Sequence, residues 1–456
     1  MSIFKACDIR GVYGRELTDE TVYGIGRAVG TMLGRKSVVV GGDVRVSTPS
    51  LKSALIGGLV ESGALVIDIG IVPTPAFYFA KRHLDADAGV MVTASHNPPE
   101  FNGLKLALGP LPITAEELQR IRDLSEKGEF TSGTGGVREA DIIPSYLSFI
   151  QHTAPRPAGM QSSKIIVDCG NGCYSRIAPD VFRRFGYHVE ELFCAPDGTF
   201  PSRGPDSAVA ENLTELRSGM RGGDSILGIA FDGDGDRVSF VDELGRFLSS
   251  DKAIVILSRH ILADNTEQKV IYDLKCSSVV SEAISRAGGI PVPERSGHAF
   301  IKTRMIAEDA IFGAELSGHY FYRELGGGDD GLYSALLMAG MLTGSGMSLA
   351  ELADEVPEYA TTPDIRVPYE GDRHEVIERI ASAFPPDAVS RLDGVKVVFP
   401  DGWALARVSV TEPVITLRFE ATDEAGLHRI MKDFLAPVAD SVESRCLHTG
   451  RAEVEP

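Results

Sequence analysis

The chain is organised around the stretch TASHNPP at residues 93–99, which follows the apolar run AGVMV at residues 88–92. The apolar run predicts a buried strand. The two prolines cannot continue a central strand, so the chain must turn after it. Ser95 therefore lies where a strand ends and the backbone bends, a usual position for a reactive hydroxyl in an α/β protein. The alternative is that Ser95 only satisfies the hydrogen bonds of a turn.

The length and composition of the chain indicate a globular protein of several domains. With 456 residues the chain is too long for one core, and 43% hydrophobic and 24% charged residues are typical of soluble proteins. The net charge of −19 argues against a nucleic-acid or anionic-membrane partner, because both need a basic surface. An anionic substrate would need a local cluster of Arg and Lys side chains.

The cysteines and the N-terminus indicate a cytoplasmic protein. The six cysteines are scattered and complete no zinc pattern, so we expect free thiols in a reducing compartment. The N-terminus has no apolar signal core, and no run approaches the ~20 apolar residues that cross a bilayer. We expect a monomer or a small homo-oligomer.

Four units follow one another along the chain. Residues 1–140, 141–247 and 248–358 each alternate strand-like and helix-like segments with short loops, which implies mainly parallel sheets with right-handed crossovers. Residues 359–456 differ in texture and predict a smaller α+β unit. The predicted fold class is therefore α/β, with three similar domains built on mainly parallel mixed sheets and an α+β C-terminal domain. The carboxylates of Asp329 and Asp330 could cap a helix predicted over residues 331–342.

The second chemical signal is DGDGDR at residues 232–237, between two predicted strands. Asp232, Asp234 and Asp236 can curl round one hard cation, because the glycines between them remove the Cβ obstacle. The loop offers no His or thiolate, which favours magnesium over zinc. An EF-hand calcium loop is disfavoured, because Arg237 stands where that loop needs glycine and strands flank it. A solvated acidic turn is the remaining alternative.

A third loop, AELSGH at residues 314–319, follows an apolar strand. Glu315, Ser317 and His319 alternate, so in an extended loop they would face one side. A carboxylate and a hydroxyl suit hydrogen bonding to sugar hydroxyls, and His319 could move a proton near neutral pH. A purely structural loop histidine is the alternative.

A fourth loop, RVSVTEP at residues 407–413, has a similar alternation. Arg407, Ser409 and Thr411 can wrap a phosphate with a guanidinium fork and two hydroxyls. The alternative is an ordinary strand with its polar face outward. The four loops lie in four successive units, which suggests a phosphosugar held in a central cleft between domains.

In order and in number, one per domain, these loops resemble the signature loops of the α-D-phosphohexomutases. The opening DIRGVYG at residues 8–14 and DLKC at residues 273–276 also fit, so the resemblance spans nearly the whole chain. The Glu-x-Ser-Gly-His form is similar to the phosphomannomutase/phosphoglucomutase branch. Phosphoglucosamine mutases share this form, usually with Gln where this chain has Leu316.

The resemblance implies a reversible interconversion of hexose 1-phosphate and hexose 6-phosphate, with mannose or glucose as the sugar. It implies a resting phosphoserine at Ser95, which gives its phosphoryl group to the substrate. The resulting hexose 1,6-bisphosphate reorients in the cleft, and its other phosphate returns to Ser95. Mg²⁺ would be held by Asp232, Asp234, Asp236 and the Ser95 phosphate, where it would neutralise charge on the transferred group.

The resemblance also implies roles for the surrounding side chains. Those expected to bind substrate are Glu315, Ser317 and His319 at the sugar, Arg407, Ser409 and Thr411 at the non-reacting phosphate, and Arg237, Lys275 and His298. The acid and base chemistry is expected from Lys105 and His319, with Arg10 nearby. His96 adjoins Ser95, but neighbouring side chains point apart in extended backbone, so we expect it to shape the loop rather than act as the base.

Several positions depart from the family pattern and could alter substrate preference. Relatives often carry Tyr in place of Cys7, Arg in place of Gly42, Gly in place of Ala314 and Asn in place of Val410. The alternative functions are a phosphoglucosamine mutase, a hexose-phosphate-binding protein without turnover, and a metal-dependent phosphatase.

Overall fold

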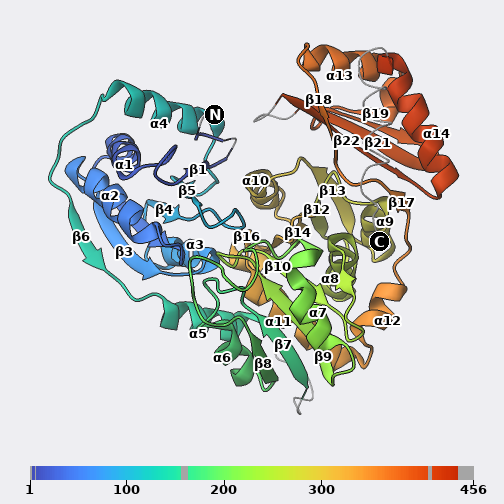
Figure 1. Ribbon diagram of the computed structural model, residues 1–456, viewed down its shortest axis with the longest axis horizontal. Coiled ribbons are helices and arrows are strands. Elements are labelled where there is room, and N and C mark those ends of the chain that lie inside the picture. The colour runs from blue at the N-terminus through green and yellow to red at the C-terminus, as the bar shows by residue number, and fades with distance from the viewer. Residues whose placement is uncertain (1–2, 6, 156–162, 409–412, 440–456) are drawn as a thin grey trace.

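A computed structural model describes residues 3–5, 7–155, 163–408 and 413–439. In Figure 1 the chain forms a heart-shaped body, with the N-terminal unit at the left and the C-terminal unit at the upper right. Four sheets are present in this part of the chain, three of them mixed and the fourth antiparallel. The mixed sheets and the distinct C-terminal unit agree with the predicted fold class. None of the described helices is both long enough and apolar enough to span a membrane.

The first sheet has the strand order β1-β5-β4-β2-β3-β6. The strands β4, β2, β3 and β6 are parallel, whereas β5 is antiparallel to both β4 and β1. The strands are β1 (Ile9–Val12), β2 (Ser37–Gly42), β3 (Leu65–Ile71), β4 (Ala88–Val92), β5 (Phe101–Ala107) and β6 (Gly136–Glu139). The helices are α1 (Asp19–Leu33), α2 (Thr48–Glu61), α3 (Thr74–His83) and α4 (Ala115–Lys127).

The second sheet has the order β11-β10-β9-β7-β8, in which β9, β7 and β8 are parallel and β10 and β11 are antiparallel to their neighbours. The strands are β7 (Lys164–Asp168), β8 (His188–Leu192), β9 (Ser225–Phe231), β10 (Val238–Val241) and β11 (Phe247–Leu248). The helices are α5 (Ile143–Thr153), α6 (Ala178–Arg184) and α7 (Thr214–Met220), with a 3-10 turn at Ala210–Leu213.

The third sheet has the order β13-β12-β14-β15-β16 and repeats this plan, with β13, β12 and β14 parallel and β15 and β16 antiparallel. The strands are β12 (Lys269–Asp273), β13 (Ile290–Glu294), β14 (Phe312–Ala314), β15 (Tyr320–Tyr322) and β16 (Gly328–Asp329). The helices are α8 (Ser250–Ala263), α9 (Ser278–Arg286), α10 (His298–Glu308), α11 (Gly331–Ser345) and α12 (Leu349–Asp354), with a 3-10 turn at Arg323–Leu325. Asp330 caps α11 by accepting a hydrogen bond from the Tyr333 amide, as predicted.

The C-terminal sheet is antiparallel, and two helices pack against it. The strands are β17 (Ala360–Thr361), β18 (Ile365–Pro368), β19 (Val389–Ser390), β20 (Val395–Phe399), β21 (Gly402–Val408) and β22 (Val414–Ala421). The helices are α13 (Arg373–Ser382) and α14 (Glu424–Leu435), with 3-10 turns at Pro386–Ala388 and Ala436–Val438.

The hydrophobic cores divide the molecule unevenly. One continuous cluster of buried side chains runs through parts of the first three units, and a second fills the other side of the first sheet. The C-terminal unit has a separate core. Among the described residues, a small buried hydrophobic group of Leu274, Trp403 and Leu405 lies where the third and fourth units meet. The first three units are therefore fused by shared packing, and the fourth is attached more loosely.

The polar loops occupy one topological position in the first three units. Each connects the last strand of the parallel set to the first antiparallel strand: residues 93–100 between β4 and β5, 232–237 between β9 and β10, and 315–319 between β14 and β15. Because the carboxyl ends of parallel strands meet at one edge of a sheet, each unit delivers its loop from the same edge. This repeated hairpin brings the three loops together.

Candidate active site

Ser95 lies at the tip of the first hairpin and is buried. Its φ of 49° is in the left-handed region, which non-glycine residues seldom adopt, and its amide donates to Thr93 Oγ1 at 2.9 Å. The hydroxyl donates to Asp232 Oδ2 at 2.8 Å, across the boundary between the first and second units. Strained backbone held by a polar network is typical of functional positions.

Arg45, which the sequence analysis did not identify, holds this loop in place. Its guanidinium is fully buried and donates to the carbonyl oxygens of four loop residues. The acceptors are Ser95 (2.8 Å), Asn97 (2.6 Å), Pro98 (2.6 Å) and Phe101 (3.0 Å). Asp43 accepts a further hydrogen bond from Arg45 Nε at 3.1 Å and balances the charge. Every residue has a backbone carbonyl, so the residue types of the loop do not show that its carbonyls bind an arginine. For this reason no pattern in the sequence indicated Arg45.

The three aspartates of the second hairpin form a buried cluster. Asp232, Asp234 and Asp236 are each at most 2% exposed, and one oxygen from each lies within 4.8 Å of the others. Asp232 Oδ1 accepts from the amides of Gly235 and Arg237, which closes the loop. Asp234 Oδ1 is buried without a hydrogen-bond partner. Burial and the two neighbouring carboxylates raise the pKa of Asp232 well above its ordinary value. An all-oxygen set of three clustered carboxylates, one with a buried free oxygen, fits a hard cation such as Mg²⁺.

Lys105 lies on β5 and contacts two of these aspartates. Its Nζ is 2.8 Å from Asp234 Oδ2 and forms a shorter ion pair with Asp236. Burial would lower the pKa of Lys105, but the carboxylates outweigh burial and raise the pKa well above its ordinary value. The Thr74 and Thr93 hydroxyls also donate to Asp234 Oδ2, at 2.6 and 3.1 Å. Lys105 is therefore a cation fixed between two carboxylates.

His96 does not lie as expected. The prediction that it points away from Ser95 assumed extended backbone, and the left-handed φ of Ser95 removes that assumption. His96 Nδ1 is 3.3 Å from Ser95 Oγ. Burial, with the positive charges of Arg237 and Arg10, holds the pKa of His96 well below its ordinary value, so the imidazole is neutral. Arg10 reaches the same loop through a hydrogen bond to Asn97 Oδ1 and pairs with Asp8 at 2.8 Å.

The third hairpin places its three predicted side chains together, with His319 at the centre. His319 Nδ1 is 2.9 Å from Ser317 Oγ and 3.1 Å from Glu315 Oε2, and its Nε2 is 3.3 Å from Asp236 Oδ1. Burial opposes a charge on this ring, but Asp236 and Glu315 raise its pKa to about 10. The backbone joins the second and third hairpins directly, because the Val238 amide donates to the Gly318 carbonyl at 3.1 Å.

Arg237 and His298 surround this histidine. Arg237 Nε lies 3.4 Å from His319 Nε2, and the rings of His298 and His319 are 6.1 Å apart between centroids. Burial and the cations Lys105 and His319 lower the pKa of His298 to about 4. Asp329, predicted only as a possible helix cap, instead lies with Oδ2 3.7 Å from His319 Nε2, and neither of its oxygens has a hydrogen-bond partner.

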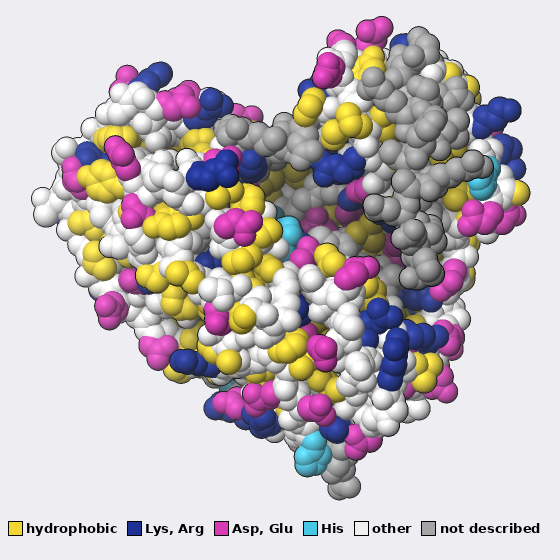
Figure 2. All heavy atoms as spheres, viewed as in Figure 1, with side chains coloured by type: hydrophobic (Ala, Val, Ile, Leu, Met, Phe, Trp, Pro, Cys, Tyr) yellow, Lys and Arg dark blue, Asp and Glu magenta, His cyan; other side chains and the backbone are white. Residues whose placement is uncertain are grey.

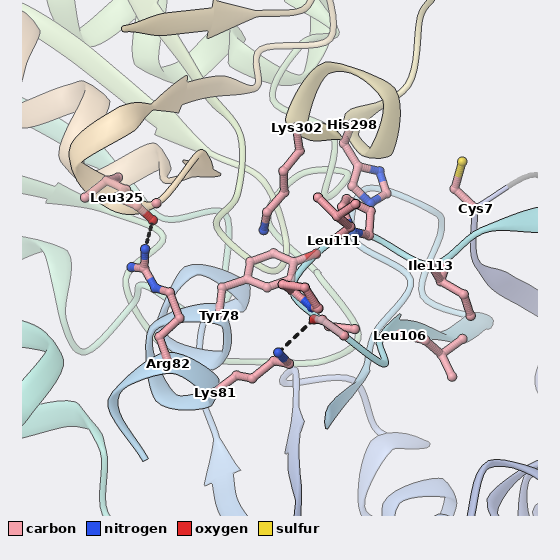
Figure 3. A pocket seen from close by; sticks show the side chains of 15 residues that line it. Cys7, Tyr78, Lys81, Arg82, Leu106, Leu111, Ile113, His298, Lys302 and Leu325 are labelled. Atoms are coloured by element: carbon pink, nitrogen blue, oxygen red, sulfur yellow. Dashed lines mark hydrogen bonds between the residues drawn. The ribbon is translucent and has the colours of Figure 1, made fainter. Parts of the chain in front are cut away.

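A cavity of about 60 Å³ lies behind this group, between the first and third units. Figure 3 shows Lys302 of α10 pointing down to the ring of Tyr78, whose centroid is 3.7 Å from Lys302 Nζ. Arg82 reaches across to the Leu325 carbonyl, and Lys81 donates to the Gly109 carbonyl at 2.8 Å. Cys7 and His298 also line the cavity, so Cys7 lies near the site that it was expected to influence.

The remaining predicted contacts lie on the side of the fourth unit. Lys275 Nζ is 3.1 Å from Asp364 Oδ2, and Arg407 Nη2 is 2.7 Å from Asp393 Oδ2. Both cations are thus paired with carboxylates. Ser409, Val410 and Thr411 lie outside the described residues. Gly42 ends β2 and is buried, and Ala314 ends β14 and is also buried.

The hairpin loops and the C-terminal unit face a common hollow. Figure 2 shows this hollow between the first and fourth units, with Lys and Arg, Asp and Glu, and His side chains at its walls. Arg10, Lys105, Arg237, Lys275 and Arg407 supply positive charge to a molecule whose net charge is −19. Four of these cations are already paired with aspartates, so an anionic ligand would bind by exchanging those partners.

Comparisons with known families agree with this architecture. Four models described as phosphoglucomutase/phosphomannomutase match successive parts of the chain. The alpha/beta/alpha domains I, II and III match residues 1–132, 144–245 and 249–359, and the C-terminal domain matches residues 383–436.

Individual relatives are similar over nearly their whole length. A phosphomannomutase/phosphoglucomutase of Pseudomonas aeruginosa is 39% identical over 440 residues, 95% of this chain and 94% of the relative. A phosphoglucomutase of Neisseria gonorrhoeae is 36% identical, with 96% of each chain covered. A solved structure of a phosphoglucomutase/phosphomannomutase family protein from Burkholderia thailandensis superimposes with a TM-score of 0.89 at 34% identity, covering 96% of this chain and 97% of that chain. This chain therefore belongs to the phosphoglucomutase/phosphomannomutase family.

Proposed function

We propose that this chain interconverts hexose 1-phosphates and hexose 6-phosphates, with mannose, glucose or both as the sugar. One observation carries the proposal: the Ser95 hydroxyl is hydrogen-bonded to Asp232 of a buried three-carboxylate cluster. A serine beside such a cluster suits phosphoryl transfer, in which positioning and charge stabilisation supply most of the catalysis.

In the proposed cycle Ser95 carries a phosphoryl group at rest. A sugar hydroxyl oxygen forms a bond to that phosphorus, the bond from phosphorus to Ser95 Oγ breaks, and a hexose 1,6-bisphosphate results. The hydroxyl proton passes to a neighbouring base, and Ser95 Oγ regains a proton. After the bisphosphate reorients, the same events run in reverse at its other phosphate, which leaves the isomeric monophosphate and restores phosphoserine.

Asp232, Asp234 and Asp236 would hold Mg²⁺, which would neutralise charge on the transferred phosphoryl group. The pKa values of Lys105 and His319 are both raised, which supports a first role as hydrogen-bond donors and proton donors rather than as bases. Asp232 Oδ2 at 2.8 Å and the neutral His96 Nδ1 at 3.3 Å are within reach of a proton on Ser95 Oγ. His96 is therefore a candidate, beside Asp232, for the proton transfer at Ser95 Oγ.

The other side chains would bind the substrate. Glu315 and Ser317 would contact sugar hydroxyls, with Arg237 and His298 beside them. Arg407, Lys275, Ser409 and Thr411 would hold the phosphate that does not react. The separate core of the C-terminal unit supports a movement of this unit over the substrate, which would keep the distal phosphate bound while the ring turns. A scattering profile that a bound bisphosphate leaves unchanged would contradict this closure.

The identity of the sugar is the open part of the proposal. The residue that differs from the usual phosphoglucosamine mutase pattern, Leu316, packs against the hydrophobic core, so its side chain is a poor guide to the sugar. We propose the boundaries 1–140, 141–247, 248–358 and 359–456 for the four domains and a cytoplasmic location.

The proposal is tested by one assay on the intact chain with magnesium. Mannose, glucose and glucosamine 1-phosphates are compared, each primed with a trace of the matching 1,6-bisphosphate. We expect conversion to the 6-phosphates with mannose or glucose preferred, and a loss of several orders of magnitude in Ser95→Ala. Activity confined to glucosamine phosphate would favour a phosphoglucosamine mutase. Net release of inorganic phosphate would favour a phosphatase, and no turnover would favour a binding protein.

A further inference from the structure

Two cysteines of the second unit lie in direct contact. Cys169 follows β7 and Cys194 follows β8, and these parallel strands pair Asp168 with Leu192. Beyond the last ladder pair, the Cys169 amide donates to the Leu192 carbonyl at 3.0 Å, so the two chains stay together as they leave the sheet. The two Sγ atoms are 3.0 Å apart. Since a disulfide bond is about 2.05 Å long, the sulfurs need to approach by only about 1 Å to form one.

The two thiols differ in access. Cys169 is completely buried, whereas the Cys194 side chain is partly exposed. The Cys194 thiol also lies 3.3 Å from the Leu192 carbonyl of β8 and 3.4 Å from the Val167 carbonyl of β7, which hold it beside the ends of both strands. An oxidant in solution would therefore meet Cys194 first, with Cys169 already in position to react with the product.

The loop that contains Cys169 supports the aspartate loop. The Cys173 amide donates to the Gly233 carbonyl at 3.0 Å, and the Gly172 amide donates to the Cys169 carbonyl at 2.8 Å. Gly172 packs so closely that a Cβ atom there would lie 2.7 Å from the Gly233 carbonyl oxygen. These contacts connect Cys169, within a few residues, to the backbone between Asp232 and Asp234.

We propose that Cys169 and Cys194 form a reversible intramolecular disulfide, and that this bond changes the affinity of the aspartate loop for its metal. The oxidant is a hydroperoxide. Cys194 sulfur attacks one peroxide oxygen, the O–O bond breaks, and Cys194 sulfenic acid and one water form from hydrogen peroxide. Cys169 sulfur then attacks the Cys194 sulfur, the S–O bond breaks, and the hydroxide leaves with the Cys169 proton as a second water. In total two thiols are oxidised and one peroxide is reduced, and a dithiol reductant reverses the change.

The bond itself is tested on the intact chain. The protein is treated with hydrogen peroxide, remaining thiols are alkylated, and the peptides are examined by mass spectrometry. We expect peptides containing Cys169 and Cys194 to be joined with the loss of two hydrogens and to separate on reduction. Cys194→Ser should give no such link, whereas Cys173→Ser, in the same loop, should give the wild-type link. Alkylation of both thiols after treatment, sulfinic acid at Cys194 without a link, or a link between two copies would overturn the proposal.

The coupling to the metal loop has a readout that does not depend on the proposed function. The melting temperature is measured against magnesium concentration for the reduced and fully linked forms. We expect the apparent magnesium affinity to differ by about twofold or more between the two forms. Peroxide treatment should leave the affinity of Cys194→Ser unchanged. Equal affinities in the linked and reduced wild type would refute the coupling.

Discussion

Replacing Arg45 with lysine should loosen the serine loop while leaving the charge in place. The Arg45 guanidinium donates to the carbonyl oxygens of Ser95, Asn97, Pro98 and Phe101 and to the Asp43 carboxylate. These five contacts use both terminal nitrogens of Arg45 and its Nε. Lysine offers three donors from a single nitrogen, so it cannot reproduce a fork that reaches five acceptors. At least two of the five acceptors then lose this partner, at a position where the Arg45 side chain is fully buried.

The magnitude follows from the number of lost contacts. A hydrogen bond from a charged donor contributes about 1.5–3 kcal/mol, so two lost bonds cost about 3–6 kcal/mol of unfolding free energy. The effect on catalysis arises because Ser95 has a left-handed φ that the loop must enforce. A displacement of about 1 Å at a reacting group can reduce the rate about 100-fold. We expect kcat to fall by that order, with a much smaller change in KM.

Two measurements check this prediction: urea unfolding, and initial rates of sugar-phosphate isomerisation for wild type and Arg45→Lys. Arg120→Lys, on the exposed face of α4, is the matched control and should stay within about 0.5 kcal/mol of wild type. If Arg45→Lys matches this control in stability and retains the wild-type kcat, the four carbonyl contacts do not hold the loop and the reasoning is wrong.

Three further predictions concern the metal, the phosphate and the pH. Asp234→Asn removes a charge and a buried free oxygen from the proposed metal site. The magnesium concentration for half-maximal activity should therefore rise by more than the roughly 10–100-fold that is typical when a residue behind the metal ligands is changed. Asp224→Asn, at an exposed position, is the control and should leave this concentration unchanged. Arg407→Gln should raise KM about 10–100-fold with little change in kcat, and an unchanged KM would remove Arg407 from the phosphate site. The pKa of His319 is raised from 6.5 to about 10 by Asp236 and Glu315. The contacts of protonated His319 with these carboxylates therefore stabilise the metal-free protein fully below pH 6.5, and this stabilisation is lost as the pH rises through 10. The melting temperature of metal-free wild type should therefore fall more steeply from pH 8 to 10.5 than that of His319→Gln, and parallel curves would contradict the assignment.

Much of the fold could be predicted because its strands are short, apolar and separated by glycines. Mainly apolar runs of the sequence coincide with the strands at Lys164–Asp168, Val238–Val241, Lys269–Asp273 and Val395–Phe399. The antiparallel strand β5 was missed, because Asn102, Gly103 and Lys105 break its apolar pattern. All three are buried, Asn102 against Ser47 and Thr48 of the same unit and Lys105 against Asp234 and Asp236 of the second unit. A polar residue satisfied by another domain looks like a loop residue when only the sequence is available.

The site shows the same division. Ser95, the three aspartates, Glu315, Ser317 and His319 meet as predicted because each lies in a hairpin with a recognisable polar pattern. Arg45 and Asp329 were not assigned to the site, since Arg45 contacts backbone carbonyls and Asp329 lies near a histidine of a neighbouring hairpin loop. His96 was misplaced because the left-handed φ of Ser95 cannot be read from residue type. Whether Arg45, Asp329 and His96 belong to the site depends on backbone conformation and on contacts between residues far apart in the sequence, which residue types alone do not give.

The central claim is that Ser95 carries the phosphoryl group, and its direct test is the phosphorylation state of that residue. Purified chain is stripped of phosphate with excess hexose monophosphate and then incubated with hexose 1,6-bisphosphate and magnesium. Mass spectrometry of the peptide that contains Ser95 measures the outcome. The account predicts one added phosphoryl group on Ser95, its loss on renewed incubation with monophosphate, and none in Ser95→Ala. A Ser95 that remains unmodified while the enzyme still isomerises sugar phosphates would contradict it.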